Sequence, residues 1–210
     1  MLCVRYIIYK KKKGESVTML VYHGSSVEVI HPDITRSRLD IDFGSGFYTT
    51  QDIHMAKKWA CNRNESILNI YELELEDFEV KKLGVDEEWL YYVMENRTGR
   101  TGLFEMPFDD SKYDIIIGPT ADDKLFNVID LFSDGFISSE NAIKVINCMN
   151  YSNQLVIKNQ AAANRIRFIE SKRLHGLEKD NLRVQFKNDN IEASKKAREL
   201  IRKMNGGIKR

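Results

Sequence analysis

Three side chains stand in short motifs where chemistry could take place. His23 ends an apolar run in "YHGSS", Tyr48 lies in the glycine-flanked "GSGFYTT", and Gln154 stands near the head of "SNQLVIKN". Imidazole, phenol and amide groups can all exchange hydrogen bonds with a ligand. They can act together only if the elements that carry them bring them to one place.

The glycine-rich stretch "GSGFYT" does not fit a dinucleotide-binding turn. That fingerprint needs a third glycine where this sequence has Thr49, and a helix must follow the turn, whereas β-forming residues follow here. The sequence also lacks a phosphate-cradling Gly-Lys-Ser/Thr loop, a Gly-x-Ser-x-Gly elbow and a zinc spacing. The histidines, at 23, 31, 54 and 175, are scattered, so no metal site is expected.

The pattern of apolar residues predicts an α+β protein. Helices and strands alternate without a regular βαβ rhythm, which disfavours a doubly wound sheet. The predicted strands are 19–23, 47–50, 66–75, 113–119 and 153–158, and the predicted helices are 52–62, 86–97, one from 120 and 138–149, with basic helical stretches in the tail. The first of these helices is expected to be capped by Thr50 or Asp52.

Charge is strongly segregated along a chain whose net charge is only +1. Residues 1–18 sum to +4, residues 19–157 to −12 and residues 158–210 to +9. This division predicts an N-terminal extension (1–18), a central domain (19–170) and a basic, largely helical tail (171–210). The tail is either a solvated helix face or a surface for nucleic acid or an acidic partner.

The cellular location is expected to be the cytoplasm. The apolar residues of the N-terminus precede its lysines, the reverse of a secretory signal, and no apolar run is long enough to span a bilayer. Cys3, Cys61 and Cys148 are odd in number and lack disulfide or metal spacing, which fits free thiols in a reducing compartment.

Taken together, the motifs resemble the ADP-ribosyltransferase superfamily, and more narrowly its diphtheria-toxin-like, His-Tyr-Glu branch. The resemblance rests on a strand ending "YHGS", a strand "GSGFYTT" followed by an amphipathic helix, and a late strand headed by a polar residue. "YDIIIGPTADD" resembles a bacterial group of transferase-like domains, several of them encoded beside antitoxin-like genes. The resemblance covers residues 19–170 and implies a split antiparallel β-sheet core with flanking helices.

The resemblance also implies roles for three residues. His23 would hydrogen-bond the adenosine-side ribose of NAD, Tyr48 would pack on the nicotinamide, and Gln154 would hold a ribose hydroxyl. A pyridinium is cationic, and an aromatic face attracts such a ring by about 0.5–2 kcal/mol. The implied NAD-binding set is His23, Gly24, Ser25, Arg36, Arg38, Gly46, Phe47, Tyr48 and Thr49. Solvated loop charge is the alternative for Arg36 and Arg38.

Gln154 departs from the family pattern, in which this residue is Glu. Its amide can accept the ribose hydroxyl but brings no charge to stabilise an oxocarbenium-like centre. Either another acid helps, with Asp40 and Asp42 as candidates, or Gln154 suffices because nicotinamide leaves as a neutral molecule. Ser152 and Lys158 are expected to share a strand face with Gln154. Arginine-modifying relatives carry Gln or Glu at the position of Ser152, so the resemblance argues against an arginine acceptor. Lys158, together with the basic tail, suggests contact with phosphates.

The implied function is mono-ADP-ribosyl transfer from NAD, consumed as a substrate, to a nucleic acid or protein, in a toxin or anti-phage effector. An antitoxin or immunity protein is an implied partner. Two alternatives stay open: an NAD glycohydrolase with water as acceptor, and an inactive, transferase-shaped binding module that the Gln at position 154 favours.

Overall fold

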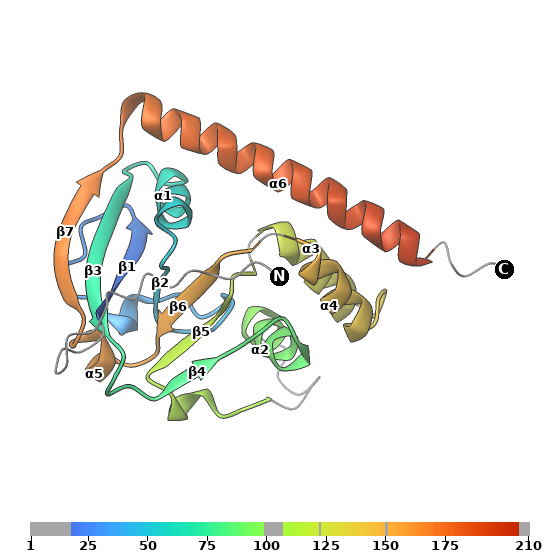
Figure 1. The fold of residues 1–210 in the computed structure, drawn as a ribbon, viewed down its shortest axis with the longest axis horizontal. Helices are drawn as coiled ribbons and strands as arrows, with labels where there is room; N and C mark the ends of the chain where they lie inside the picture. Colours follow the sequence, from blue (N-terminus) through green and yellow to red (C-terminus); the bar gives the residue numbers. More distant parts are fainter. Residues whose placement is uncertain (1–17, 99–106, 122, 150, 206–210) are drawn as a thin grey trace.

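Two β-sheets form the centre of the protein (Figure 1). The computed structural model describes residues 18–98, 107–121, 123–149 and 151–205. One sheet has the antiparallel order β1-β3-β7, and the other has the order β2-β6-β5-β4, in which only β4 and β5 are parallel. The strands are β1 (Thr18–Ser25), β2 (Phe47–Thr49), β3 (Ile67–Glu74), β4 (Val80–Lys82), β5 (Ile115–Pro119), β6 (Asn153–Ile157) and β7 (Arg167–Arg173). The α+β expectation is therefore confirmed.

Helices pack against both sheets and against one another (Figure 1). They are α1 (Ile53–Cys61), α2 (Glu87–Thr98), α3 (Asp123–Ser133), α4 (Ser139–Asn147), α5 (Gln160–Ala163) and α6 (Gly176–Asn205), with 3₁₀ turns at Ile34–Arg36 and Asp110–Lys112. Asp52 caps α1, as expected, by accepting hydrogen bonds from the backbone N–H groups of His54 (2.9 Å) and Met55 (3.3 Å).

An isolated β-bridge joins the two sheets, between Tyr22 of β1 and Thr50, the residue that follows β2. Tyr22 and Thr50 exchange backbone hydrogen bonds of 2.8 and 3.0 Å, which places the end of β1 beside β2. His23 follows this junction on β1 and Tyr48 precedes it on β2. The junction thus explains why two motifs 25 residues apart lie together.

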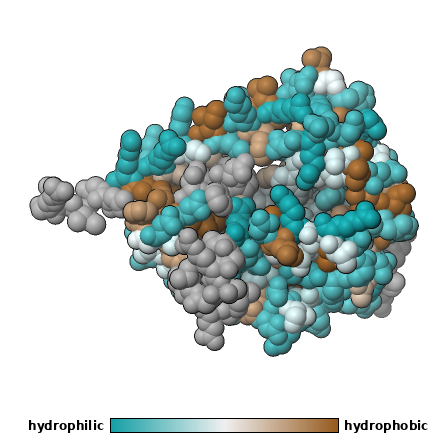
Figure 2. Space-filling model, turned by 180° about the vertical axis from the view of Figure 1, so that it is seen from behind, coloured by the Kyte–Doolittle hydropathy of each residue, from teal (hydrophilic) through white to brown (hydrophobic). Residues whose placement is uncertain are grey.

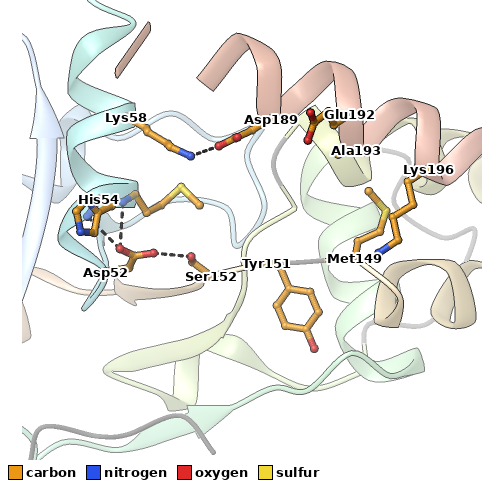
Figure 3. A pocket seen from close by; sticks show the side chains of 11 residues that line it. Asp52, His54, Lys58, Met149, Tyr151, Ser152, Asp189, Glu192, Ala193 and Lys196 are labelled. Atoms are coloured by element: carbon orange, nitrogen blue, oxygen red, sulfur yellow. Dashed lines mark hydrogen bonds and ion pairs between the residues drawn. The ribbon is translucent and has the colours of Figure 1, made fainter. Parts of the chain in front are cut away.

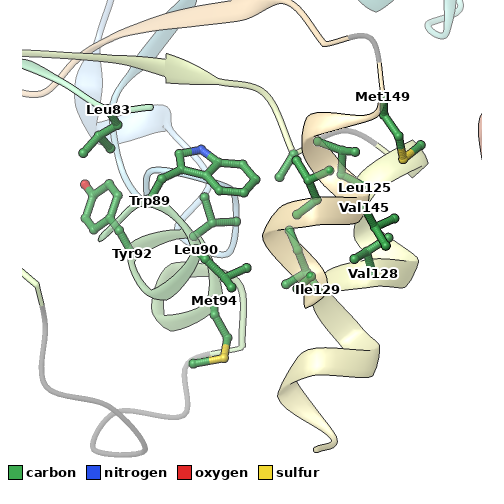
Figure 4. Packing of buried hydrophobic residues seen from close by; sticks show 14 of the residues in the cluster. Leu83, Trp89, Leu90, Tyr92, Met94, Leu125, Val128, Ile129, Val145 and Met149 are labelled. Atoms are coloured by element: carbon green, nitrogen blue, oxygen red, sulfur yellow. The ribbon is translucent and has the colours of Figure 1, made fainter. Parts of the chain in front are cut away.

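The core is divided between the two halves of the protein. The largest cluster of buried side chains lies where α2, α3 and α4 pack, and Trp89, Leu125 and Val145 belong to it (Figure 4). A second cluster fills the space between the sheets and includes Val21 and Leu155. Burying aliphatic and aromatic side chains is worth about 1.5–3 kcal/mol each, so these clusters hold the two sheets in place.

A glycine is required where β1 meets α1. A Cβ atom on Gly24 would lie 2.1 Å from the carbonyl oxygen of Ala56 and 2.6 Å from the backbone nitrogen of Ala60. Only a residue without a side chain allows this approach. The helix therefore lies directly against the strand that carries His23.

The long helix α6 runs along one side of the protein and packs on α1, α3 and α4 (Figure 1). It lies within the expected tail, but β7 runs to Arg173 and so crosses the boundary expected after residue 170. Because β7 pairs with β3, the tail begins inside a sheet. Residues 1–17 of the expected N-terminal extension lie outside the described residues, and β1 begins at Thr18.

The surface seen in Figure 2 is mainly hydrophilic, with hydrophobic side chains in several separate places. Within the described residues, no helix combines the length and apolar character needed to cross a bilayer. Cys61 and Cys148 are free thiols, whereas Cys3 falls outside the described residues.

Candidate active site

A cleft of about 1140 Å³, called the central cleft here, is lined by His23, Tyr48 and Gln154. Ligand pockets for small molecules are commonly about 300–1,000 Å³, so this cleft has room for a dinucleotide. The three side chains come from β1, β2 and β6. The structure therefore brings together residues that lie up to 131 positions apart, the condition on which the sequence-based hypothesis depends.

His23 presents a neutral imidazole to the central cleft. Burial lowers the pKa of His23 to about 4, a hydrogen bond to the Tyr48 backbone opposes this shift, and the Arg63 charge adds to it. Its Nδ1 lies 2.7 Å from the carbonyl oxygen of Tyr48. Because a carbonyl only accepts, Nδ1 carries the proton and Nε2 keeps a lone pair. Nε2 can accept a hydrogen bond from a ligand hydroxyl.

Tyr48 uses its hydroxyl to hold the loop that precedes β2. The phenol donates to the carbonyl oxygen of Gly44 at 2.8 Å and accepts from the backbone N–H of Phe43 at 2.9 Å. Burial raises the pKa of this phenol far above its ordinary value, so it stays protonated. Since the hydroxyl is engaged within the protein, the ring is the part of Tyr48 that can meet a ligand.

Gln154 is buried in the lining of the cleft, beside the ion pair of Asp42 and Arg97. Its Nε2 donates to Oδ2 of Asp42 at 2.9 Å, and the same oxygen accepts from the backbone N–H of Ala121 at 2.7 Å. The other Asp42 oxygen accepts from Nε of Arg97 at 2.6 Å. Because Nε2 is held by Asp42, Oε1 is the Gln154 atom left to accept a hydrogen bond from a ligand.

Asp42, and not Asp40, is therefore the acid that lies beside Gln154. Asp42 is buried and lines the cleft, whereas Asp40 is exposed and does not line it. The carboxylate of Asp42 is neutralised by Arg97 and accepts hydrogen bonds at both oxygens, so it orients the Gln154 amide and adds no free charge. Arg97, the last residue of the predicted helix 86–97, was not foreseen as part of the site.

Most of the wider predicted set also lines the cleft: Gly24, Ser25, Arg36, Arg38, Gly46 and Phe47. The Phe47 ring lies 4.6 Å from the His23 ring between centroids. Arg36 is exposed and paired with Asp33 at 3.2 Å. Thr49 does not line the cleft, because its buried hydroxyl donates to the carbonyl oxygen of Leu155 at 2.8 Å.

Glycines shape the floor of the cleft as well. Gly46 has a φ of +157°, and a Cβ there would lie 2.8 Å from the carbonyl oxygen of Ile157. Glycine alone tolerates both the dihedral angle and the close approach of β6. This glycine therefore allows the chain to turn tightly into β2.

Asn69 is a buried polar residue behind the cleft lining, and it was not foreseen from the sequence. Its Oδ1 accepts from the backbone N–H of Val29 at 2.9 Å, and its Nδ2 donates to the Ser25 hydroxyl at 3.0 Å. These bonds hold the loop after β1 against β3. A lone amide within the apolar run "SILNIYELEL" was the available signal, because buried polar side chains are normally hydrogen-bonded.

Ser152 and Lys158 do not share the surroundings of Gln154. Ser152 precedes β6, where strand alternation does not apply, and its hydroxyl donates to Asp52 at 2.8 Å in a separate pocket of about 370 Å³ (Figure 3). That pocket lies among α1, α6 and the segment before β6. The ammonium of Lys158 is buried and paired with Asp110 at 3.2 Å, so the expected phosphate contact is wrong for this residue.

No metal site is expected, and none of the described residues form a cluster of three or more His, Cys, Asp or Glu side chains suited to one. Residues 19–168 match a family described as "Protein of unknown function (DUF3990)". The chain belongs to the DUF3990 family. No curated protein and no solved structure matches the chain significantly.

The DUF3990 match contains the core of the candidate site. It runs from β1 into β7 and includes His23, Tyr48 and Gln154 together with Asp42 and Arg97. All of α6 lies beyond the matched residues. Yet Phe186 of α6 lines the central cleft, so a segment outside the family match contributes to the site.

Proposed function

We propose that the central cleft binds NAD and that the protein is a mono-ADP-ribosyltransferase acting on a macromolecular acceptor. The observation that carries the proposal is that His23, Tyr48 and Gln154, the residues matched to the His-Tyr-Glu motif, line one cleft of dinucleotide size. NAD is consumed in this reaction as the donor of ADP-ribose. A toxin or anti-phage role, with an antitoxin as partner, is the biological setting that we propose.

Each of the three residues would act on a different part of NAD. The neutral His23 would accept a hydrogen bond from a hydroxyl of the adenosine ribose through Nε2. The Tyr48 ring would pack on the cationic nicotinamide, and Oε1 of Gln154 would accept from a hydroxyl of the nicotinamide ribose. The pKa of about 4 supports the first role, because a protonated imidazole could not accept.

The reaction replaces one bond to C1′ of the nicotinamide ribose with another. The glycosidic bond breaks, its electron pair leaves with nicotinamide, and the departing base is neutral. A nucleophilic atom of the acceptor then bonds to C1′ and releases its proton to solvent. Gln154 brings no charge, and the Asp42 charge is already paired with Arg97, so positioning contributes more to this chemistry than electrostatic stabilisation of the oxocarbenium.

A nucleic-acid acceptor is favoured by the exposed basic residues on the second half of α6. These are Lys195, Lys196, Arg198, Arg202 and Lys203. If several of them bind phosphates, the affinity for an oligonucleotide falls steeply with salt concentration. An affinity that does not depend on salt, or that survives deletion of the C-terminal half of α6, argues for a protein acceptor.

The proposal is tested by incubating the full chain with a bacterial lysate and NAD radiolabelled in its adenylate phosphate. We expect nicotinamide release and transfer of label to macromolecules, both lost in His23→Ala and retained in the control His175→Ala, which changes an exposed histidine outside the cleft. Release of free ADP-ribose without labelled macromolecules identifies a glycohydrolase instead.

A binding module without turnover is the second candidate, and the neutral surroundings of Gln154 favour it. In that case NAD or ADP-ribose binds to the cleft, but the wild type and His23→Ala release equally little nicotinamide. Binding measured by calorimetry in parallel with nicotinamide release separates the two candidates. If neither binding nor release is found, both are wrong.

A further inference from the structure

One wall of the central cleft is built by the end of α1 and by α6. Trp59, Asn62, Arg63 and Phe186 form this part of the lining, which is called the aromatic wall here. It lies beside His23: a Cβ on Gly24 would be 3.0 Å from the Cβ of Trp59, and the Arg63 charge lowers the pKa of His23.

A second set of contacts holds α6 in this position. Arg183 donates from Nε to the carbonyl oxygen of Cys61 at 2.7 Å and from a terminal nitrogen to that of Arg63 at 3.2 Å. These bonds join α6 to the last turn of α1. Phe186 lies almost one turn further along α6, so the same contacts keep its ring at the cleft.

The four side chains of the aromatic wall have no ring-stacking, hydrogen-bond or ion-pair partner among the described residues. The rings of Trp59 and Phe186 are half-buried and stack on no other ring of the described chain. Within the same residues, the Asn62 amide makes no hydrogen bond and the Arg63 guanidinium makes no ion pair. All four groups are thus available to a ligand.

These four groups suit a purine base. Stacking a base on an aromatic side chain contributes about 1–3 kcal/mol, and a guanidinium adds a cation–π contact. An Asn amide pairs well with N6 and N7 of adenine, because it offers one acceptor and one donor side by side. An apolar partner helix would make no use of the unpaired amide and guanidinium.

We infer that the aromatic wall binds the adenine ring of an adenine nucleotide and that α6 is for this reason part of the binding site. The assignment to the adenine end of NAD rests on the proposed function. The binding of adenine itself does not, because it can be measured with AMP, which has no nicotinamide to lose. The basic C-terminal segment thereby gains a role in binding the donor, separate from any contact with the acceptor.

Tryptophan fluorescence of the full chain provides the test. The sequence has two tryptophans, and Trp89 is fully buried in the core, so quenching by AMP reports on Trp59. We expect saturable quenching by AMP that disappears in Trp59→Phe. Phe186→Ala should weaken AMP binding about tenfold, as expected for the loss of one stacking partner. Phe136→Ala, which removes an equally large ring that is 72% exposed and outside the cleft, is the matched control.

Asn62→Ala tests base selectivity in a residue whose loss cannot disturb the core, because Asn62 is exposed. We expect the wild type to prefer AMP over GMP and CMP and the variant to lose this preference. Far-ultraviolet circular dichroism of each variant shows that it is folded. Absence of quenching by millimolar AMP, equal affinity for CMP, or unchanged affinity in folded Phe186→Ala overturns the inference.

The test of adenine binding does not depend on whether the protein cleaves NAD. If AMP binds through Phe186 but no nicotinamide is released, the inference stands and the proposed function fails. If NAD is cleaved and Phe186→Ala changes neither the KM for NAD nor the affinity for AMP, the proposed function stands and the inference fails. If both are right, Phe186→Ala raises KM and leaves kcat close to that of the wild type.

Discussion

Two parts of the central cleft, called the His23 end and the Gln154 end here, are built on different physical principles. At the His23 end, the polar group is a neutral imidazole on the three-stranded sheet. The imidazole donates to one backbone carbonyl, and the strand that carries it packs closely on α1 at Gly24. At the Gln154 end, a neutral amide lies against a buried pair of opposite charges, Asp42 and Arg97. The first end depends on shape and desolvation, and the second depends on charge balance.

This difference shows where substitutions should be costly. Replacing a neutral group in a packed site costs its hydrogen bonds and contacts, whereas removing one member of a buried ion pair leaves a charge without a partner. The Gln154 end should therefore be the more sensitive to changes of charge, and the His23 end the more sensitive to pH.

The largest effect is expected for Asp42→Ala. Removal of this carboxylate takes away the group that pairs with Arg97 and accepts from Gln154 and Ala121, so the free energy of unfolding should fall by about 3–5 kcal/mol. Urea denaturation measures the change. Asp40→Ala, in the same loop but exposed, should stay within about 0.5 kcal/mol of the wild type. If the two substitutions lowered the free energy of unfolding equally, the buried pair of Asp42 and Arg97 would not be the cause of the loss.

Gln154→Glu should also be destabilising, although it restores the residue usual in the resembling family. The new carboxylate would lie against Asp42, now 2.9 Å from the amide, and like charges at this distance oppose ionisation of both. We expect a loss of roughly 1–3 kcal/mol at neutral pH that shrinks in mild acid. Thermal unfolding at several pH values measures it.

Exchanging the amide and the carboxylate should reverse that loss. Asp42→Asn combined with Gln154→Glu keeps a single negative charge near Arg97, so the two changes should compensate with an interaction energy of roughly 1–3 kcal/mol. If the proposed function is right, the double variant should also release nicotinamide faster than the wild type, because its charge lies at position 154. Additive losses in the double variant would show that the two residues are not coupled.

The lowered pKa of His23 should make the stability of the folded protein depend on pH. The pKa of His23 is about 4 in the folded protein against 6.5 ordinarily, so the unfolded chain takes up the proton first as the pH falls. Stability from this group is complete above about pH 6.5 and is lost between pH 6.5 and 4, by about 2–3 kcal/mol.

The contribution of His23 is isolated by comparing the unfolding of the wild type and of His23→Gln between pH 6.5 and 4. The stability of the variant should change less with pH, because glutamine can donate to the Tyr48 carbonyl without titrating. His175→Gln should behave like the wild type, since His175 is exposed. Parallel pH curves for the wild type and His23→Gln would contradict a buried neutral imidazole.

The smallest effect is expected for Tyr48→Phe, between the two ends. The variant keeps the ring but loses the hydrogen bonds to Phe43 and Gly44, so stability should fall by about 1 kcal/mol. Differential scanning calorimetry measures the loss. In a nicotinamide-release assay, Tyr48→Phe should retain more activity than Tyr48→Ala, because the proposed contact with nicotinamide uses the ring. Equal activity of the two variants would exclude that role for the ring.

The sequence predicted most of the helices and strands and missed those in which the apolar residues show no period. Strands such as 66–75 and the helix at 52–62 have clear periodicity, and the structure has β3 and α1 in these places. Three elements were not foreseen: β4, α5 and β7. β4 and α5 have three and four residues, too few to show a period. β7, at the edge of its sheet, is mostly exposed and polar, so its sequence gave no apolar alternation.

The amino-acid sequence by itself determined the order of the motifs and the local chemistry that each of them needs. The capping Asp52 and the polar residues at the ends of the strands can be recognised without any structure, because these features are local. The need for glycine at positions 24 and 46 is tertiary, because a Cβ there would meet α1 or β6. Only the tertiary structure decided that Asp42, Arg97 and Gln154 form one network and that Phe186 reaches the cleft. The hydrogen bonds of this network join residues 55 and 112 positions apart, and the cleft lining extends from His23 to Phe186. Such neighbours are set by how sheets and helices pack.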